Sequence, residues 1–145
     1  MESSSRSRGF TLIEIMVVVV ILGVLAAMVA PKILSRPDQA KVTVAQSDIE
    51  TLSQALELYR LDNGIYPTTD QGLEALVHKP SYGPEARRWN EEGYLKQTPQ
   101  DPWGNDYIYL QPGNNGKFDL FSVGADGREG GEGLNSDITN WSTDR

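Results

Sequence analysis

The sequence predicts an α+β fold: a long N-terminal α-helix, half membrane-spanning and half amphipathic, packed on a small antiparallel β-sheet, with a short second helix and a long C-terminal loop. Three observations carry this prediction. An apolar run covers residues 10–30, a helical apolar stripe follows it, and two β-patterned segments lie within residues 107–123 of the 145-residue chain. About 115 residues beyond the apolar run suffice for one small domain.

The apolar run from Phe10 to Ala30 covers roughly 30 Å as a helix, which is the thickness of the hydrocarbon core of a bilayer. Its one charged residue is Glu14. A carboxylate in a spanning segment is costly in lipid and needs a partner. Because the next basic residue, Lys32, lies beyond the far end of the run, we expect the partner of Glu14 on another chain.

Two simpler readings of this run stay open from the residues alone. A secretory signal peptide would use Arg6 and Arg8 as its basic start and Val24-Leu25-Ala26 as its cleavage site, but the apolar core is too long for one. An ordinary membrane anchor explains the length equally well and leaves Glu14 without a purpose.

The second half of the long helix follows two prolines. Pro31 and Pro37 predict a kink or a locally melted stretch between Ala30 and Asp38. Apolar residues then recur at helical spacing, which predicts one amphipathic helix to about Leu61, with Asn63-Gly64 as its stop. The stripe consists of Val42, Ala45, Ile49, Leu52, Leu56 and Tyr59. It is too short for a confident coiled coil, so we expect it to pack on the core of its own domain.

The remaining elements are short. Thr68 and Gln71 have the spacing of a capping box, and Asp101-Pro102-Trp103-Gly104 has the composition of a turn. We expect a helix at about Asp70–His78, strands at Tyr107–Leu110 and Lys117–Val123 joined by the loop Gln111–Gly116, and a third strand near Tyr94-Leu95.

Composition excludes several classes of function. The formal net charge of -7 falls almost wholly after Pro31, and such a surface repels phosphates, so no nucleic acid partner is expected. The absence of cysteine rules out disulfides. His78 is the single histidine, which leaves histidine-based triads and zinc motifs unsupported, and no enzymatic activity is expected.

The segment Gly9-Phe10-Thr11-Leu12-Ile13-Glu14, after a short basic leader, resembles the cleavage and methylation signature of type IV pilins and pseudopilins. The resemblance implies that a prepilin peptidase cuts after Gly9 and that Phe10 becomes the N-methylated first residue. It also implies that Glu14 pairs with the amino terminus of a neighbouring subunit in a helical filament.

Motifs further along the chain are similar to those of the major pseudopilins of type II secretion systems, the G-type subunits. These motifs are Tyr66-Pro67-Thr68-Thr69, Gln71-Gly72-Leu73, Asp101-Pro102-Trp103-Gly104, Gly124-Ala125-Asp126-Gly127, and Asp137-Ile138 with Trp141. The resemblance implies a type IV pilin-like fold with a cleaved leader (1–9), a transmembrane and assembly helix (10–30), its amphipathic continuation (31–63) and a globular domain (64–145).

The same resemblance implies location and partners. The amino terminus would be cytoplasmic, the chain would cross the bacterial inner membrane once, and the acidic domain would be periplasmic. Its partners would be further copies of itself in a pseudopilus, minor pseudopilins, the inner-membrane assembly platform and the prepilin peptidase. Such a filament would drive export of folded proteins across the outer membrane. The alternative is a membrane-anchored monomeric binding module that depends on calcium.

An acidic, glycine-rich loop lies between Val123 and Trp141, and Ile138 and Trp141 beyond it can pack. From the residues alone, the loop is a solvated surface segment or a calcium site, because calcium takes carboxylate, carbonyl and amide oxygens. The resemblance implies calcium. Its ligands would be the carboxylates of Asp126 and Asp137 and the carbonyls of Val123 and Arg128, with Asn135 or Ser136 as weaker candidates and with Glu129 and Glu132 hydrated.

Overall fold

The computed structural model describes residues 9–34 and 36–142, and the side chains of all of these except 29–34 and 36. The chain divides into two compact units after Pro37. Within the described residues, no helix is both long enough and apolar enough to cross a membrane. The predicted span of residues 10–30 includes side chains outside the described set and stays a prediction, and the leader lies outside it except for Gly9.

Two helices build the N-terminal half of the chain. Helix α1 covers Leu12–Leu34 and continues past Pro31, and helix α2 covers Arg36–Asn63. Pro37 is the second residue of α2, a position at which a missing N–H costs no intrahelical hydrogen bond. Helical backbone is therefore present on both sides of residue 35, which itself lies outside the described residues.

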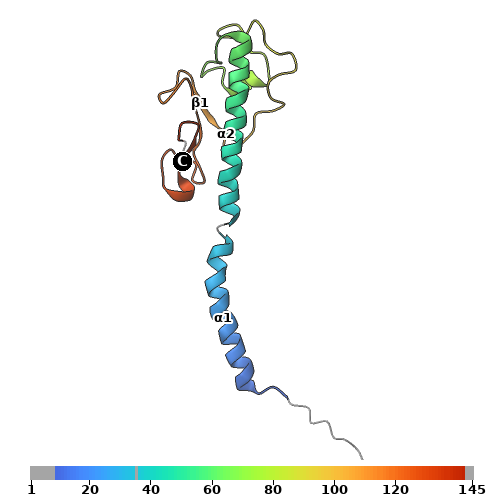
Figure 1. Cartoon of the computed structure of the whole chain (residues 1–145), viewed down its shortest axis with the longest axis vertical. Helices are drawn as coiled ribbons and strands as arrows, with labels where there is room; N and C mark the ends of the chain where they lie inside the picture. The colour runs from blue at the N-terminus through green and yellow to red at the C-terminus, as the bar shows by residue number, and fades with distance from the viewer. Residues whose placement is uncertain (1–8, 35, 143–145) are drawn as a thin grey trace, which may run out of the picture. The chain divides into compact units, whose positions relative to one another are not determined.

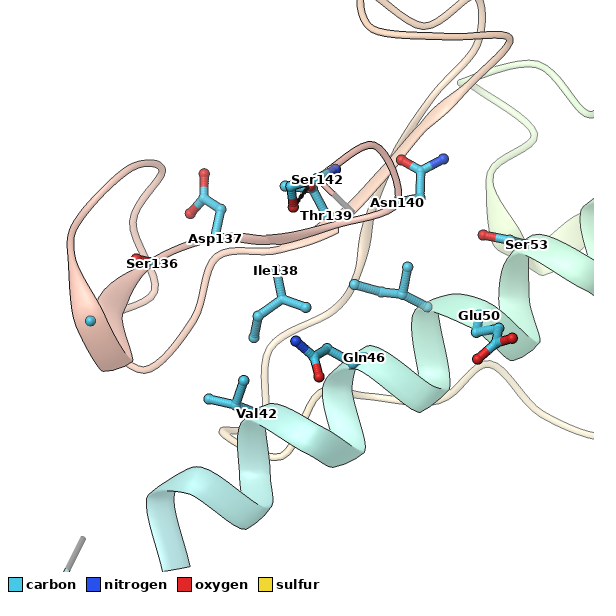
Figure 2. A pocket seen from close by; sticks show the side chains of 12 residues that line it. Val42, Gln46, Glu50, Ser53, Ser136, Asp137, Ile138, Thr139, Asn140 and Ser142 are labelled. Carbon is cyan, nitrogen blue, oxygen red and sulfur yellow. Dashed lines mark hydrogen bonds between the residues drawn. The ribbon is translucent and has the colours of Figure 1, made fainter. Parts of the chain in front are cut away.

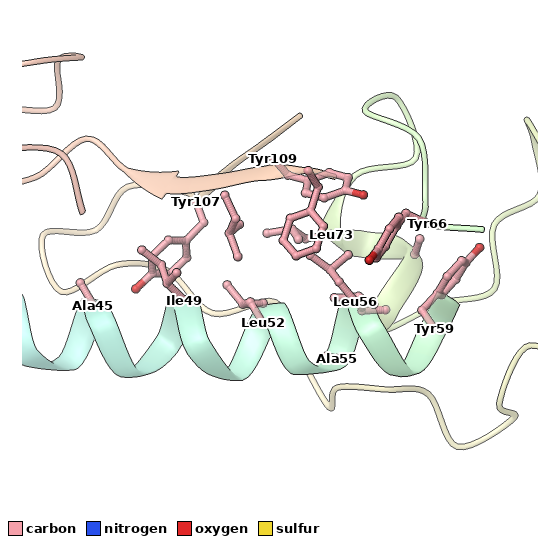
Figure 3. Close-up of a cluster of buried hydrophobic side chains, with 14 of the residues drawn as sticks. Ala45, Ile49, Leu52, Ala55, Leu56, Tyr59, Tyr66, Leu73, Tyr107 and Tyr109 are labelled. Atoms are coloured by element: carbon pink, nitrogen blue, oxygen red, sulfur yellow. The ribbon is translucent and has the colours of Figure 1, made fainter. Parts of the chain in front are cut away.

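The apolar stripe of α2 faces the core of the globular unit, as predicted. Ala45, Leu52, Leu56 and Tyr59 are fully buried, and Ile49 is 4% exposed. Figure 3 shows these side chains along one side of α2, opposite aromatic and leucine side chains of the sheet and loops. The stripe thus packs within its own domain. The helix ends where Asn63-Gly64 predicted, because Gly64 adopts a φ of 80° and its N–H donates to the carbonyl of Arg60 at 2.7 Å.

The sheet has three antiparallel strands in the order β1-β2-β3, beside α2 (Figure 1). They are β1 (Ile108–Leu110), β2 (Asp119–Ser122) and β3 (Ile138–Thr139). Tyr109 lies opposite Leu120, and Ser122 lies opposite Ile138. The third strand predicted near Tyr94-Leu95 is wrong: both of these N–H groups donate to the carbonyl of Leu76 instead, and β3 comes from the C-terminal segment.

The second helix is shorter than predicted. The expected capping box is present, since the N–H of Gln71 donates to Thr68 Oγ1 (3.2 Å) and the N–H of Thr68 donates to Gln71 Oε1 (3.0 Å). Gly72 follows with a φ of 59°, which ends regular helical geometry directly after the box. What remains is a single 3₁₀ helix, η1 (Leu73–Leu76), so the prediction of a helix over Asp70–His78 is wrong in its extent.

The C-terminal segment closes the domain through Asn140. Its N–H donates to the carbonyl of Leu120 at 3.0 Å, its Oδ1 accepts the N–H of Leu120 at 2.9 Å, and its Nδ2 donates to the carbonyl of Phe118 at 3.2 Å. Ile138 is buried, and Trp141 packs edge-on against Phe121. These contacts confirm that residues beyond the acidic loop pack on the domain, and they fix the far end of that loop.

Candidate functional site

The first candidate site is the start of α1, where Thr11 precedes the first helical residue. Thr11 Oγ1 accepts the backbone N–H of Glu14 at 3.2 Å, and the carbonyl of Thr11 accepts the N–H of Ile15 at 3.3 Å. Thr11 is therefore the N-cap of the helix, since it satisfies donors that have no intrahelical acceptor. The sequence interpretation missed this role, although the Thr-x-x-Glu spacing of a capping box was visible.

Glu14 lies in the first turn of α1, where a negative charge interacts favourably with the helix dipole. Its side chain is exposed, and Phe10 is 79% exposed. Among the described residues two ion pairs form, Arg60 with Glu57 and Arg87 with Glu85, and neither includes Glu14. The cap fixes Glu14 near the helix start, but within the described part of the chain the structure provides no cation for it.

The body of α1 exposes its apolar side chains. The large apolar residues that are exposed here are Leu12, Ile13, Ile15, Met16, Val17, Val18, Val19, Val20, Ile21, Leu22, Val24, Leu25 and Met28. They surround the helix, whereas in α2 one apolar stripe is buried and the other faces are mostly polar, with Val44, Leu58 and Leu61 exposed among the polar residues. An exposed apolar surface of this kind marks an interaction site.

The second candidate site is the acidic loop, whose two ends meet. A Cβ on Gly124 would lie 2.9 Å from the carbonyl oxygen of Ser136 and 3.3 Å from that of Asn135. Gly124 has a φ of 70°, so glycine is required there both by the backbone and by this close approach. The structure therefore brings Gly124, which follows the predicted ligand Val123 in sequence, beside the predicted ligands Asn135 and Ser136.

The predicted carboxylate ligands organise the loop between these ends. Asp126 Oδ1 accepts the N–H of Arg128 at 3.1 Å, and Asp137 Oδ2 accepts the N–H of Gly130 at 3.0 Å. The other oxygen of the second carboxylate, Asp137 Oδ1, is buried and has no hydrogen-bond donor among the described residues. A buried carboxylate oxygen without a donor is costly, so this atom fits a cation ligand.

The structure does not complete a metal cluster from side chains alone. No group of three or more His, Cys, Asp or Glu residues converges within the described residues. Glu129, Glu132 and Asn135 are exposed. A cation here would depend on backbone carbonyl oxygens as well as on the two aspartates, which is a donor set that calcium accepts.

Beside this loop, a groove of about 690 Å³ separates the C-terminal segment from α2 (Figure 2). Ile138 points toward Val42 and Gln46 of α2, whereas Asp137 projects to the other side of its segment. The alternation follows from extended backbone, in which successive side chains point to opposite faces. Ile138 therefore anchors the loop to the domain while Asp137 remains directed into the loop.

Two buried carboxylates elsewhere hold turns. Asp101 begins the predicted turn Asp101-Pro102-Trp103-Gly104, which is confirmed because the N–H of Gly104 donates to the carbonyl of Asp101 at 2.9 Å, whereas the sequence interpretation assigned Asp119 no role. Asp101 Oδ1 accepts the N–H groups of Trp103 (3.1 Å) and Asn105 (2.8 Å), and its Oδ2 accepts the hydroxyl of Ser122 at 2.6 Å. Asp119, 2% exposed, accepts three N–H groups from the loop before β2. These aspartates serve the fold, because their oxygens are occupied by donors of the same chain.

A tyrosine joins the end of α2 to the loop that follows it. Tyr66 Oη donates to Glu57 Oε1 at 2.6 Å, and Arg60 Nε donates to Glu57 Oε2 at 3.2 Å. Burial, together with this hydrogen bond, raises the pKa of Tyr66 to about 12. The same hydrogen bond lowers the pKa of Glu57. The pair holds the Tyr66-Pro67 segment against the helix.

Comparison with known proteins identifies families and relatives that this chain resembles. A family model described as "Type II secretion system (T2SS), protein G" matches residues 32–141, and a "Prokaryotic N-terminal methylation motif" matches residues 4–30. The chain is similar to the type II secretion system core protein G of Pseudomonas aeruginosa (64% identity over 136 residues, 94% of this chain and 96% of that protein). It is also similar to the protein of that name from Vibrio cholerae (56% over 141 residues, 97% and 96%).

A solved structure is also similar to this chain. The crystal structure of the major pseudopilin from the type 2 secretion system of enterohaemorrhagic Escherichia coli matches with a TM-score of 0.67 and 46% identity, over 75% of this chain and 93% of that one. The family model covers most of the chain, and the relatives cover nearly all of it. This chain belongs to the type II secretion system protein G family.

Proposed function

We propose that this chain is a structural subunit of a type II secretion pseudopilus. It polymerises through its N-terminal helix into a periplasmic filament that drives export of folded proteins across the outer membrane. The observation that carries the proposal is the contrast between the two helices. The apolar stripe of α2 is buried in its own domain, whereas α1 exposes apolar side chains on all sides. Something outside the domain must cover α1.

Two environments cover α1 in succession. Before assembly, its apolar residues anchor the chain in the inner membrane. In the filament, other copies of α1 replace the lipid. Lipid and neighbouring copies of α1 are both apolar surroundings, so the hydrophobic effect favours the filament over the membrane only weakly. Close packing between the helices therefore contributes to assembly. Exposure to water is strongly disfavoured, at roughly 25 cal/mol per Å² of apolar surface.

Glu14 fixes the register of this packing. Its carboxylate lies near the start of a helix whose surroundings in a filament are apolar, and a carboxylate buried there needs a cation. The match of the methylation motif to residues 4–30 supports cleavage after Gly9 and methylation at Phe10. The new amino terminus of a neighbouring subunit then supplies the positive charge.

The acidic loop binds calcium in this proposal. The carboxylates of Asp126 and Asp137 and the carbonyls of Val123 and Arg128 hold the ion, with Asn135 or Ser136 as additional candidates. The buried, donor-free Asp137 Oδ1 supports this assignment. The ion would neutralise the two aspartates and tie the loop to the end that Ile138 anchors. Calcium would thereby stabilise the folded domain.

The partners follow from the same role. They are further copies of this chain, minor pseudopilins, the inner-membrane assembly platform and the prepilin peptidase. The amino terminus is cytoplasmic before assembly, and the acidic globular domain is periplasmic. Membership of a secretion family in which relatives are named core proteins supports assembly with other components of the system.

Mass spectrometry of the mature amino terminus tests the proposal. Chain isolated from membranes of cells with the prepilin peptidase should begin at N-methylated Phe10, and chain from cells without the peptidase should keep the leader. An uncleaved chain in both strains would contradict the pseudopilin assignment. It would favour a membrane-anchored monomeric calcium-dependent module instead.

A further inference from the structure

The chain contains two Asn-Gly dipeptides, Asn63-Gly64 and Asn115-Gly116. Asparagine followed by glycine is chemically labile, because the next residue has no Cβ and its backbone nitrogen can approach the side-chain amide carbon of asparagine. The two dipeptides are identical in sequence, so any difference in their reactivity in the folded protein comes from the structure. Their surroundings differ at both reacting groups.

The first dipeptide is locked at the end of α2. Asn63 Nδ2 donates to the carbonyl of Tyr59 (3.0 Å) and to the hydroxyl of Tyr94 (3.1 Å), and Asn63 Oδ1 accepts the N–H of Arg88 (3.0 Å). The attacking nitrogen is also engaged, since the N–H of Gly64 donates to the carbonyl of Arg60 at 2.7 Å. Cyclisation at Asn63 requires local opening of all these bonds.

The second dipeptide lies exposed in the loop between β1 and β2. Asn115 Nδ2 donates to Asp119 Oδ2 at 3.1 Å, and this is the one hydrogen bond of its side chain among the described residues. Over the same residues, neither Asn115 Oδ1 nor the N–H of Gly116 has a hydrogen-bond partner. The attacking nitrogen and the amide carbonyl therefore make no hydrogen bond that must first open, and one hydrogen bond holds the leaving group.

We propose that Asn115 is a site of spontaneous deamidation in the folded protein. The backbone nitrogen of Gly116, after losing its proton to hydroxide, attacks Cγ of Asn115 and forms a new C–N bond. The Cγ–Nδ2 bond breaks, and Nδ2 leaves as ammonia after taking a proton from water. Water then opens the resulting succinimide at either carbonyl. The products are aspartate or isoaspartate at position 115.

Deamidation at Asn115 has a structural consequence because of Asp119. The buried carboxylate of Asp119 accepts the N–H of Asn114 (2.9 Å), the N–H of Asn115 (3.1 Å) and Asn115 Nδ2. A carboxylate at position 115 replaces a donor by an acceptor and adds a like charge to a group that is 2% exposed. The modification therefore destabilises the β1–β2 connection.

The test uses the full chain in detergent, incubated in mildly alkaline buffer and digested with trypsin. Peptides 61–87 and 97–117 separate the two dipeptides, since trypsin cuts after Arg60, Arg87, Lys96 and Lys117 and spares Lys79-Pro80. Position 115 should convert to the acid, and position 63 should convert roughly hundredfold more slowly because its hydrogen bonds must open first. Equal rates in the folded chain, or no conversion at position 115, would overturn the proposal.

Controls separate chemistry from structure. In urea, where the chain is unfolded, positions 63 and 115 should deamidate at similar rates. A difference in rate that persists in urea would mean that the neighbouring sequence causes it, and this would contradict the structural argument. Gly116→Ala should slow conversion at position 115, and the added Cβ has room, with its nearest neighbour at 3.8 Å. Asn115→Asp should lower the melting temperature of the wild-type chain. In a chain that already carries Asp119→Asn, the same Asn115→Asp substitution should lower the melting temperature much less. An unchanged melting temperature for Asn115→Asp would refute the proposed consequence.

Discussion

Tyr107 Oη donates a hydrogen bond of 2.8 Å to Asp48 Oδ2, which joins the segment before β1 to the middle of α2 across 59 positions of sequence. Tyr107 is 6% exposed, and burial, followed by this hydrogen bond, raises the pKa of its phenol. Tyr59 lies in the same core, fully buried, and its hydroxyl has no partner among the described residues. Among the buried tyrosines of the core, Tyr107 therefore has a hydrogen-bond partner for its hydroxyl, whereas Tyr59 has none among the described residues.

Replacing Tyr107 by phenylalanine should destabilise the domain by about 1.5–3 kcal/mol, because the hydrogen bond to a carboxylate is lost and Asp48 keeps its negative charge without that donor. Urea denaturation of the full chain in detergent measures the change. The matched variant Tyr59→Phe removes a hydroxyl that lacks a partner and should be neutral or stabilising. Similar losses in the two variants would show that the hydrogen bond does not carry the effect.

Stability should fall at alkaline pH. Burial raises the pKa of Tyr59, Tyr66, Tyr94, Tyr107 and Tyr109 above the ordinary value of 10.0, to about 12 for Tyr66. A folded-state pKa above the unfolded value means that the folded chain binds more protons, so this stability is complete below pH 10 and is lost as pH rises toward 12 and beyond. Thermal melting should show the decline, and tyrosinate absorbance should rise with unfolding. Ionisation of these five tyrosines near pH 10 in a folded chain would contradict it.

Calcium should raise the melting temperature of the chain. If calcium binds only the folded state, the gain is about 2.7 kcal/mol when free calcium is one hundred times Kd. Asp137→Ala should abolish the gain, and Asp126→Ala should reduce or abolish it. Glu129→Ala, at an exposed position of the same loop, is the matched control and should preserve it. The calcium site is absent if EGTA leaves the wild-type melting curve unchanged.

Gly113→Ala should destabilise the connection between β1 and β2. A Cβ at this position would lie 2.6 Å from Asp119 Oδ1 and 2.8 Å from the backbone nitrogen of Asp119, so the loop and the buried carboxylate would have to move apart. Gly116→Ala in the same loop meets no such contact and should change the melting temperature little. A Gly113→Ala chain as stable as wild type would show that the loop relaxes freely.

The sequence was most informative where structure is local. The stripe from Val42 to Tyr59 and the stop at Asn63-Gly64 depend on helical periodicity and on one residue in the left-handed region, and both are confirmed. The third strand was missed because Ile138-Thr139 pairs with a distant segment and is too short to show alternation. The helix after Thr68 was overextended because Gly72 ends it through a backbone conformation that periodicity does not reveal.

In the candidate sites, too, local features could be predicted from the sequence and features that depend on tertiary packing could not. The start of α1 could be predicted from consecutive residues, and so could the cap by Thr11, which the sequence interpretation missed. The ends of the acidic loop could be proposed from composition, but the contact of Gly124 with Ser136 and the isolation of Asp137 Oδ1 arise only from tertiary packing. The turn-holding hydrogen bonds of Asp101 and Asp119 are local, whereas the bond from the Ser122 hydroxyl to Asp101 joins residues 21 positions apart and arises only from folding.

Electron microscopy of the periplasmic fraction of cells that express this chain, and of surface material sheared from them, tests the central claim most directly. The wild-type chain should yield filaments that contain it. Glu14→Ala should yield none while the globular domain remains folded, because the carboxylate that meets the neighbouring amino terminus is gone. Glu91→Ala, at an exposed position of the globular domain, should still assemble. Filaments of normal abundance from Glu14→Ala cells, or none from wild-type cells with a complete secretion system, would contradict the account.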